Sequence, residues 1–272
     1  MALKIREMGL RAASALVLAP LAVFAVWLGG VWIAAIMMAA CMLLAMEWAK
    51  MSARQNWRPI FAVVGLTLMA AVAATHAAGL SFGLVLMVFG AALSALFARS
   101  RGLSMTDAAY GVLYIGWPAV LFIWLRDGDS AAGFYWVTLA FAVTWAADIV
   151  AFLAGSLVGG PKLWPRYSPN KTWAGFIGGL VAGTAAGGLM VALPQAGVQT
   201  LWLSAFLGLA AAAAAMAGDL WESALKRRFG VKDAGAIIPG HGGLLDRVDG
   251  LMFAIVVVAA GRALFLQFGG AL

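Results

Sequence analysis

Charge is scarce in this chain. Only 11% of its 272 residues are charged and 64% are hydrophobic, whereas a soluble domain carries about 25% charged residues. The mean hydropathy of +0.97 therefore excludes an ordinary water-soluble protein. Cysteine is nearly absent as well, because Cys41 stands alone within an apolar stretch. A single cysteine excludes an intrachain disulfide and a cysteine metal cluster, and we expect it to serve packing.

Long apolar runs recur from one end of the chain to the other. Each is close to the length of about 20 residues that a helix needs to cross the hydrocarbon of a membrane. The runs lack period-two alternation, and backbone in lipid must be hydrogen bonded internally, so helices are expected rather than barrel strands. The sequence predicts an all-α polytopic integral membrane protein with about nine transmembrane helices. The predicted spans are 9–28, 31–49, 59–77, 80–98, 108–125, 131–154, 173–193, 198–222 and 250–267.

The first span resembles a signal peptide, because Lys4, Arg6 and Arg11 accompany its apolar stretch. It is long, however, and leads almost directly into a second span. An uncleaved first helix is therefore favoured over a cleaved signal.

Basic residues predict the orientation. With a cytoplasmic N-terminus and nine spans, only Arg126 and Arg262 fall on or toward the outer side. The cytoplasmic side receives Lys4, Arg6, Arg11, Lys50, Arg54, Arg58, Arg99, Arg101, Lys162, Arg166, Lys171, Lys226, Arg227, Arg228, Lys232 and Arg247. This asymmetry follows the positive-inside rule. The net charge of +7 is thus explained by topology and by anionic lipid headgroups, and not by a nucleic-acid partner.

Polar clusters divide the chain into two functional parts. Residues 1–107 contain no residue pair suggestive of chemistry, and we expect Glu47 and Asp107, at span ends, to be solvated or paired interface charges. This part is expected to give support, with lipid access or dimer contacts. Residues 108–272 hold every functional polar cluster, all on the predicted cytoplasmic side, and are expected to be the catalytic region. Six glycines of the 173–193 span predict close helix packing: Gly175, Gly178, Gly179, Gly183, Gly187 and Gly188. The outer-loop acids Asp127 and Asp129 are expected in a solvated turn.

Asp148 and the loop 159–173 are the first two candidate parts of a site. An unpaired aspartate inside a span costs several kcal/mol, so Asp148 is expected to be a buried functional acid, with a helix cap or pairing role as the alternative. In the loop, glycine and proline break the helix before Ser168, Lys171 and Thr172. Ser168 or Thr172 can cap the next helix, whose N-terminal amides together with Lys171 would bind an anion. The loop could also be only a positive-inside anchor.

The third part extends from Asp219 to Asp249. Asp219, Ser223 and Lys226 recur at four- and three-residue steps, so they share one face of a helix expected over 198–229. At 1.5 Å per residue this helix would be about 45 Å long and would project beyond the hydrocarbon. Asp246 and Asp249 are three residues apart at the start of the last span, so both carboxylates can face one point.

Hard oxygen ligands without cysteine suit Mg²⁺, which binds a few carboxylates together with substrate phosphates and water. Asp219, Asp246 and Asp249 are the candidate ligands, and Asp148 is a further ligand or an outer partner. An internal salt-bridge network is the alternative. His241 is favoured as a turn residue or phosphate donor over a metal ligand.

The segment 223–249 resembles the signature of the phosphatidate cytidylyltransferases, also called CDP-diacylglycerol synthases. The matching positions are Ser223, Leu225, Lys226, Arg227, Lys232, Asp233, Gly235, Ile238, Pro239, His241, Gly242, Gly243, Leu244, Asp246, Arg247, Val248 and Asp249. The run 168–173 is similar to the family's Ser-Pro-Lys-Lys-Thr-Trp, with Asn170 as a departure that removes one cation. The resemblance covers about 140–260.

This resemblance implies a membrane enzyme that converts CTP and phosphatidate into CDP-diacylglycerol and pyrophosphate with Mg²⁺, and it leaves open a second cation and a homodimer. We expect a bacterial inner-membrane protein whose site faces the cytoplasm, with membrane lipids as partners. The expected catalytic residues are Asp219, Asp246, Asp249, Lys226 and Arg247. The expected substrate-binding residues are Ser168, Lys171, Thr172, Ser223, Arg227, Lys232, Asp233 and His241. The expected metal ligands are Asp219, Asp246, Asp249 and Asp148.

Two alternatives stay open. A secondary transporter could use Asp148, Asp219 and the signature acids as an ion relay, although the charges lie on one side and no inverted repeat is found. Another CTP-using lipid enzyme is the nearer alternative, either a polyprenol kinase or a cytidylyltransferase for a different phospholipid. The products separate these enzymes, since a kinase releases CDP and a cytidylyltransferase releases pyrophosphate.

Overall fold

The chain is an all-α polytopic membrane protein. A computed structural model describes residues 20–126, 131–193, 200–237 and 242–268. Eight helices of this described part are long and apolar enough to cross a membrane. They are α2 (Gly30–Ser52), α3 (Trp57–Ala78), α4 (Leu80–Ser100), α5 (Met105–Arg126), α6 (Ala131–Leu157), α7 (Trp173–Leu189, extended by the short helix η1, Met190–Ala192), α8 (Leu201–Arg228) and α9 (Leu245–Gln267).

Eight of the predicted spans are confirmed, with ends shifted by a few residues. The long helix expected over 198–229 is also confirmed as α8, Leu201–Arg228. Residues 20–28 of the first predicted span are helical, and the remainder of that span lies outside the described residues, as do Asp127 and Asp129.

The chain forms two compact units that do not follow the sequence order. The first unit comprises Met1–Asp129 and Arg228–Val248, and the second comprises Ser130–Arg227 and Asp249–Leu272. The chain passes from one unit to the other within α9. The functional division predicted between residues 107 and 108 is a different one and stays a prediction.

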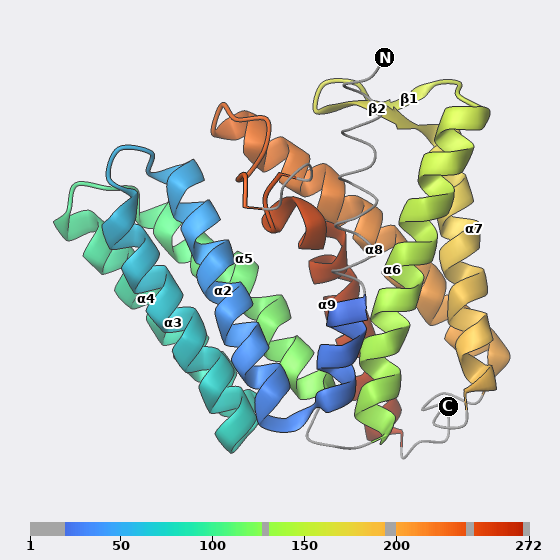
Figure 1. Cartoon of the computed structure of the whole chain (residues 1–272), viewed down its shortest axis with the longest axis horizontal. Helices are drawn as coiled ribbons and strands as arrows, with labels where there is room; N and C mark the ends of the chain where they lie inside the picture. The colour runs from blue at the N-terminus through green and yellow to red at the C-terminus, as the bar shows by residue number, and fades with distance from the viewer. Residues whose placement is uncertain (1–19, 127–130, 194–199, 238–241, 269–272) are drawn as a thin grey trace. The chain divides into compact units, whose positions relative to one another are not determined.

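Helices α2 to α5 make up most of the first unit and lie side by side in Figure 1. Helix α5 is the most buried of the four, and it packs against α2, α3 and α4. Trp48 of α2 is buried in this bundle, where its Nε1 donates to the carbonyl of Asp107 at 2.9 Å. A side chain at Gly111 of α5 would overlap the Trp48 indole, so the sequence permits α2 and α5 to approach closely here.

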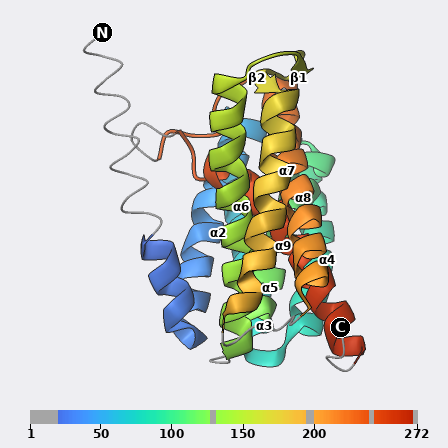
Figure 2. The same ribbon diagram turned by 90° about the vertical axis from the view of Figure 1, so that its right-hand side faces the viewer.

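In the second unit α7 packs against α6 on one side and against α8 on another (Figure 2). The glycines of α7 permit this packing, as predicted. A Cβ atom at Gly175 would lie 2.7 Å from the carbonyl oxygen of Ala151 in α6, and one at Gly187 would lie 2.6 Å from Cα of Gly208 in α8. Backbone therefore lies directly on backbone at both faces of α7.

The segment between α6 and α7 forms a β-hairpin, where the sequence predicted only a loop. Strand β1 (Lys162–Trp164) pairs antiparallel with β2 (Ser168–Thr172). Gly159 and Gly160 have φ of 66° and 88°, a left-handed backbone that ends α6 and that glycine adopts most readily. The hairpin pairs this segment's backbone groups with each other (Figure 1).

Thr172 begins α7, which confirms that a hydroxyl of this segment caps the helix. Its buried Oγ1 accepts a hydrogen bond from the backbone N–H of Gly175 at 3.1 Å. Thr172→Val keeps the shape but removes the acceptor, so we expect the free energy of unfolding to fall by about 1 kcal/mol. Thermal unfolding in detergent measures this loss, and Thr172→Ser, which keeps the oxygen, should restore most of it. Equal stability of the valine and serine variants would contradict the cap.

Candidate active site

Two glycines bring α8 and α9 into backbone contact in the second unit. A Cβ atom at Gly218 would lie 2.6 Å from the carbonyl oxygen of Asp249, and one at Gly250 would lie 3.0 Å from that of Ala215. Each glycine adjoins an aspartate in sequence, as Gly218–Asp219 and Asp249–Gly250. The crossing of the two helices therefore places Asp219 and Asp249 within electrostatic range of each other.

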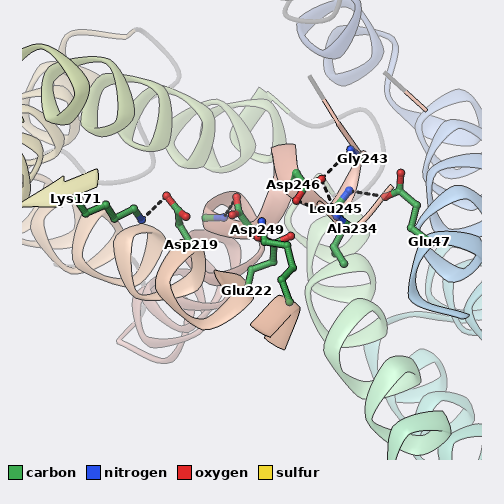
Figure 3. Close-up of polar contacts among 11 residues, drawn as sticks. Glu47, Lys171, Asp219, Glu222, Ala234, Gly243, Leu245, Asp246 and Asp249 are labelled. Carbon is green, nitrogen blue, oxygen red and sulfur yellow. Dashed lines mark hydrogen bonds and ion pairs between the residues drawn. The ribbon is translucent and has the colours of Figure 1, made fainter. Parts of the chain in front are cut away.

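Lys171 from β2 forms an ion pair with Asp219 (Figure 3). The side chains are 28% and 39% exposed, so both remain accessible from outside the helix packing. Asp249 is partly buried, and its Oδ1 accepts a hydrogen bond from the backbone N–H of Gly250 at 2.8 Å. The structure thus joins Lys171, Asp219 and Asp249, which the sequence proposed as site residues from three separate segments.

Glu222 belongs to the same cluster, although it was not among the residues predicted from the sequence. This glutamate is fully buried on α8 and pairs with Lys226 one turn later. It also lies within electrostatic range of Asp249. The spacing of four residues between Glu222 and Lys226 was the available signal, because such residues are neighbours on a helix surface. The cluster therefore contains three carboxylates and two lysines, which we call the acid–lysine cluster (Lys171, Asp219, Glu222, Lys226 and Asp249).

Asp246 occupies a different setting, in the first unit. Its Oδ2 accepts from the backbone N–H of Gly243 at 2.8 Å. The N–H of Ala234 lies 3.0 Å from Oδ2 and 3.2 Å from Oδ1. Through these bonds Asp246, in the first turn of α9, holds the backbone of the segment that follows α8 (Figure 3). The predicted metal role of Asp246 stays a prediction.

Glu47 departs from its expected role. Its position at a span end predicted a solvated or paired interface charge, and this is wrong, because Glu47 is buried with 1% of its surface exposed. Its two carboxylate oxygens accept hydrogen bonds from the backbone N–H groups of Leu244 and Leu245, at 2.9 and 2.8 Å. For Asp107 the paired alternative is confirmed, since its Oδ1 lies 2.6 Å from Nη2 of Arg228.

Asp148 is exposed on α6, so the expected burial of this acid is wrong. The neighbouring residues Ala147 and Ala151 face α7, where they meet Gly179, and the helical rotation turns Asp148 away from that contact. Its metal role stays a prediction.

The remaining predicted site residues lie in varied surroundings. Those that are exposed are Arg227, Lys232, Asp233 and Arg247; those that are partly buried are Ser168 and Ser223. His241 lies outside the described residues.

The donor chemistry of the acid–lysine cluster fits Mg²⁺. Among the described residues no group of three or more histidine, cysteine or acidic side chains is arranged to hold a metal by itself. Magnesium does not require such a cage, because it usually binds one or two carboxylates and completes its shell with water and substrate phosphates. Asp219 and Asp249 can supply those two carboxylates.

The fold and the acid–lysine cluster define a polytopic membrane protein with a charged site suited to phosphate chemistry. A model described as the cytidylyltransferase family matches residues 9–265, and the chain belongs to this family.

Curated relatives carry a more specific name. The chain is 36% identical over 265 residues to a phosphatidate cytidylyltransferase of Brucella abortus, covering 94% of each chain. Identity and coverage are the same for the Brucella melitensis protein of that name. A Staphylococcus saprophyticus phosphatidate cytidylyltransferase is 40% identical over 152 residues, covering 56% of this chain and 58% of that protein.

Proposed function

We propose that this protein transfers the cytidylyl group of CTP to phosphatidate, which yields CDP-diacylglycerol and pyrophosphate. The observation that carries the proposal is the placement of Lys171 against Asp219 and beside Asp249. It occurs in a chain that aligns over 94% of its length with phosphatidate cytidylyltransferases.

The proposed reaction needs charge stabilisation more than proton transfer. A phosphate oxygen of phosphatidate, already ionised near neutral pH, forms a bond to the α-phosphorus of CTP. The bond from that phosphorus to the bridging oxygen breaks, and its electron pair leaves on pyrophosphate. No strong general base is required, so the barrier lies in bringing anions together and stabilising the leaving group.

The acid–lysine cluster supplies both signs of charge for this task. Lys171 and Lys226 carry ammonium groups that would neutralise phosphates, with Arg227 of the same unit as a further cation. Asp219 and Asp249 would hold Mg²⁺, and a bound magnesium ion would draw negative charge from the phosphates and the leaving group. The ion pair between Lys171 and Asp219 holds an ammonium group beside the carboxylates of the cluster.

The proposal places the reaction at the cytoplasmic face of a bacterial inner membrane. The lipid substrate resides in the bilayer and CTP is dissolved in the cytoplasm, so an interfacial site gives access to both. The basic residues expected on that side by the positive-inside rule support this orientation. A homodimer stays a prediction.

Release of pyrophosphate tests the reaction. Detergent-purified protein should release pyrophosphate only when CTP, phosphatidate and Mg²⁺ are all present, and Asp246→Asn should abolish the release. Omission of each component in turn is the control. Release of CDP instead would identify a kinase, and turnover with another phospholipid in place of phosphatidate would change the acceptor. A folded sample without turnover on any of these lipids would contradict the enzyme proposal.

A further inference from the structure

Glu47 of α2 caps the N-terminus of α9, a helix that is far from it in sequence. Leu244 and Leu245, whose N–H groups it binds, lie 197 and 198 residues away in sequence. These amides stand at the start of α9, where the first N–H groups of a helix have no partner within the helix. Glu47 from α2 satisfies two of them with one carboxylate. Negative charge is also favoured at this end of a helix.

Two glycines of the segment between α8 and α9 (residues 229–244), Gly235 and Gly243, leave the space that the Glu47 carboxylate occupies. A Cβ atom at Gly243 would lie 2.7 and 2.8 Å from the two carboxylate oxygens of Glu47. One at Gly235 would overlap Oε1 and lie 2.8 Å from the carboxyl carbon. Glu47 therefore fits between two stretches of the same segment, and both stretches lack side chains where they meet it.

The other end of the segment, just after α8, is bound by further residues of the same unit. Nη2 of Arg54 donates to the carbonyl oxygens of Phe229 and Gly230, both at 2.9 Å. Arg228 pairs with Asp107. The segment that runs from the end of α8 to the start of α9 is thus anchored at both ends by residues of α2, the α2–α3 loop and α5.

We infer that Glu47 is a positioning residue for cytidylyl transfer, although it lies in the part of the chain without expected chemistry. By fixing the first turn of α9, it sets the position of Asp246 and Arg247, which follow Leu245 directly. Asp246 in turn accepts hydrogen bonds from the backbone N–H groups of Ala234 and Gly243. The carboxylates of Glu47 and Asp246 therefore both bind the backbone of this segment (Figure 3). This inference rests on the proposed function.

Glu47→Gln is the sharpest test, because glutamine keeps the size and shape of the side chain. It has one acceptor oxygen, however, and its amide N–H₂ would face a backbone N–H donor. We expect kcat for pyrophosphate release to fall about 10²-fold, since small misplacements of reacting groups cost that much. KM for CTP should change by less than about threefold, because an interaction realised mainly in the transition state acts on kcat.

Hydrogen exchange gives a readout that does not depend on activity. The amides of a peptide covering 242–248 should exchange about tenfold faster in Glu47→Gln than in the wild type, because their acceptors are lost. Val64→Ala is the matched control, as Val64 is fully buried in α3 of the same unit. It should lower thermal stability without changing exchange in that peptide or kcat.

The outcomes separate the two proposals. The positioning role would be overturned if Glu47→Gln kept the wild-type kcat. It would also be overturned if Val64→Ala lowered kcat as much as Glu47→Gln does. A wild-type enzyme with no cytidylyl transfer would refute the proposed function, while hydrogen exchange would still show whether Glu47 anchors the segment.

A double-mutant comparison guards against a variant that fails to fold. Gly235→Ala should lower kcat because its methyl group collides with Glu47. In a Glu47→Ala background the collision is gone, so the further loss from Gly235→Ala should be smaller than in the wild type. Equal losses in the two backgrounds would show that Gly235 does not act through Glu47 and would contradict the inferred contact.

Discussion

Asp249→Asn is expected to lower the kcat of cytidylyl transfer by about 10³-fold while leaving the helices packed. The substitution preserves shape but removes one negative charge from the acid–lysine cluster. Asp249 lies at the crossing of α8 and α9, within electrostatic range of Asp219 and Lys171. If the two aspartates hold Mg²⁺ together, a neutral amide at one of them loses both a charge and a ligand atom.

The physical reason for so large an effect is the nature of the barrier. The reaction brings phosphatidate against CTP and releases pyrophosphate, so charge stabilisation supplies most of the catalysis. The folded state should tolerate the change. The Oδ1 of Asp249 accepts the N–H of its neighbour Gly250, and an asparagine oxygen can accept the same bond.

Three measurements check this expectation. Pyrophosphate release gives kcat, thermal unfolding in detergent verifies the fold, and titration with Mg²⁺ should show a higher concentration for half-maximal activity. Asp129→Asn is the matched control, because it makes the same chemical change in a predicted outer turn and should leave kcat unchanged. If Asp249→Asn turned over at the wild-type rate, neither the metal role nor the electrostatic role of Asp249 would hold.

Gly208→Ala is expected to lower the free energy of unfolding by about 3 kcal/mol. The added Cβ atom would lie 2.5 Å from the carbonyl oxygen of Gly183 and 2.8 Å from Cα of Gly187. These are backbone atoms of α7, so no side chain can rotate to make room. The helices α7 and α8 would have to separate, and the neighbouring residues along this helix pair would then lose their close contacts as well.

Gly188→Ala is the matched control for this loss. Its added methyl group would meet only side-chain atoms, 3.3 Å from Cδ1 of Leu201 and 3.6 Å from Cβ of Ala205. Alanine also favours helix over glycine by about 1 kcal/mol, so this variant should be neutral or more stable. Thermal unfolding of both variants in one detergent measures the difference. Equal stability would show that α7 and α8 do not meet at Gly208 as described.

The sequence by itself determined the membrane helices, and it pointed to several charged residues that the structure brings together. Each span is a local object, because its length follows from the bilayer and its backbone hydrogen bonds close within the helix. Eight predicted spans therefore agree with the structure to within a few residues. Lys171, Asp219 and Asp249 could be selected as candidates for a related reason, since charge is conspicuous in so apolar a chain. The cap at Thr172 was equally visible, because a cap depends on residues three positions apart.

Only the tertiary structure decided which polar groups meet and in what role. Nothing near Glu47 in sequence indicates that it binds amides almost two hundred residues away. Asp148 appeared buried because a single helix does not reveal which face its neighbour covers. The glycines at the α8–α9 crossing show why sequence falls short here. A glycine permits close approach, but which helix approaches, and which side chains are thereby brought together, depends on contacts between segments that lie far apart in the chain.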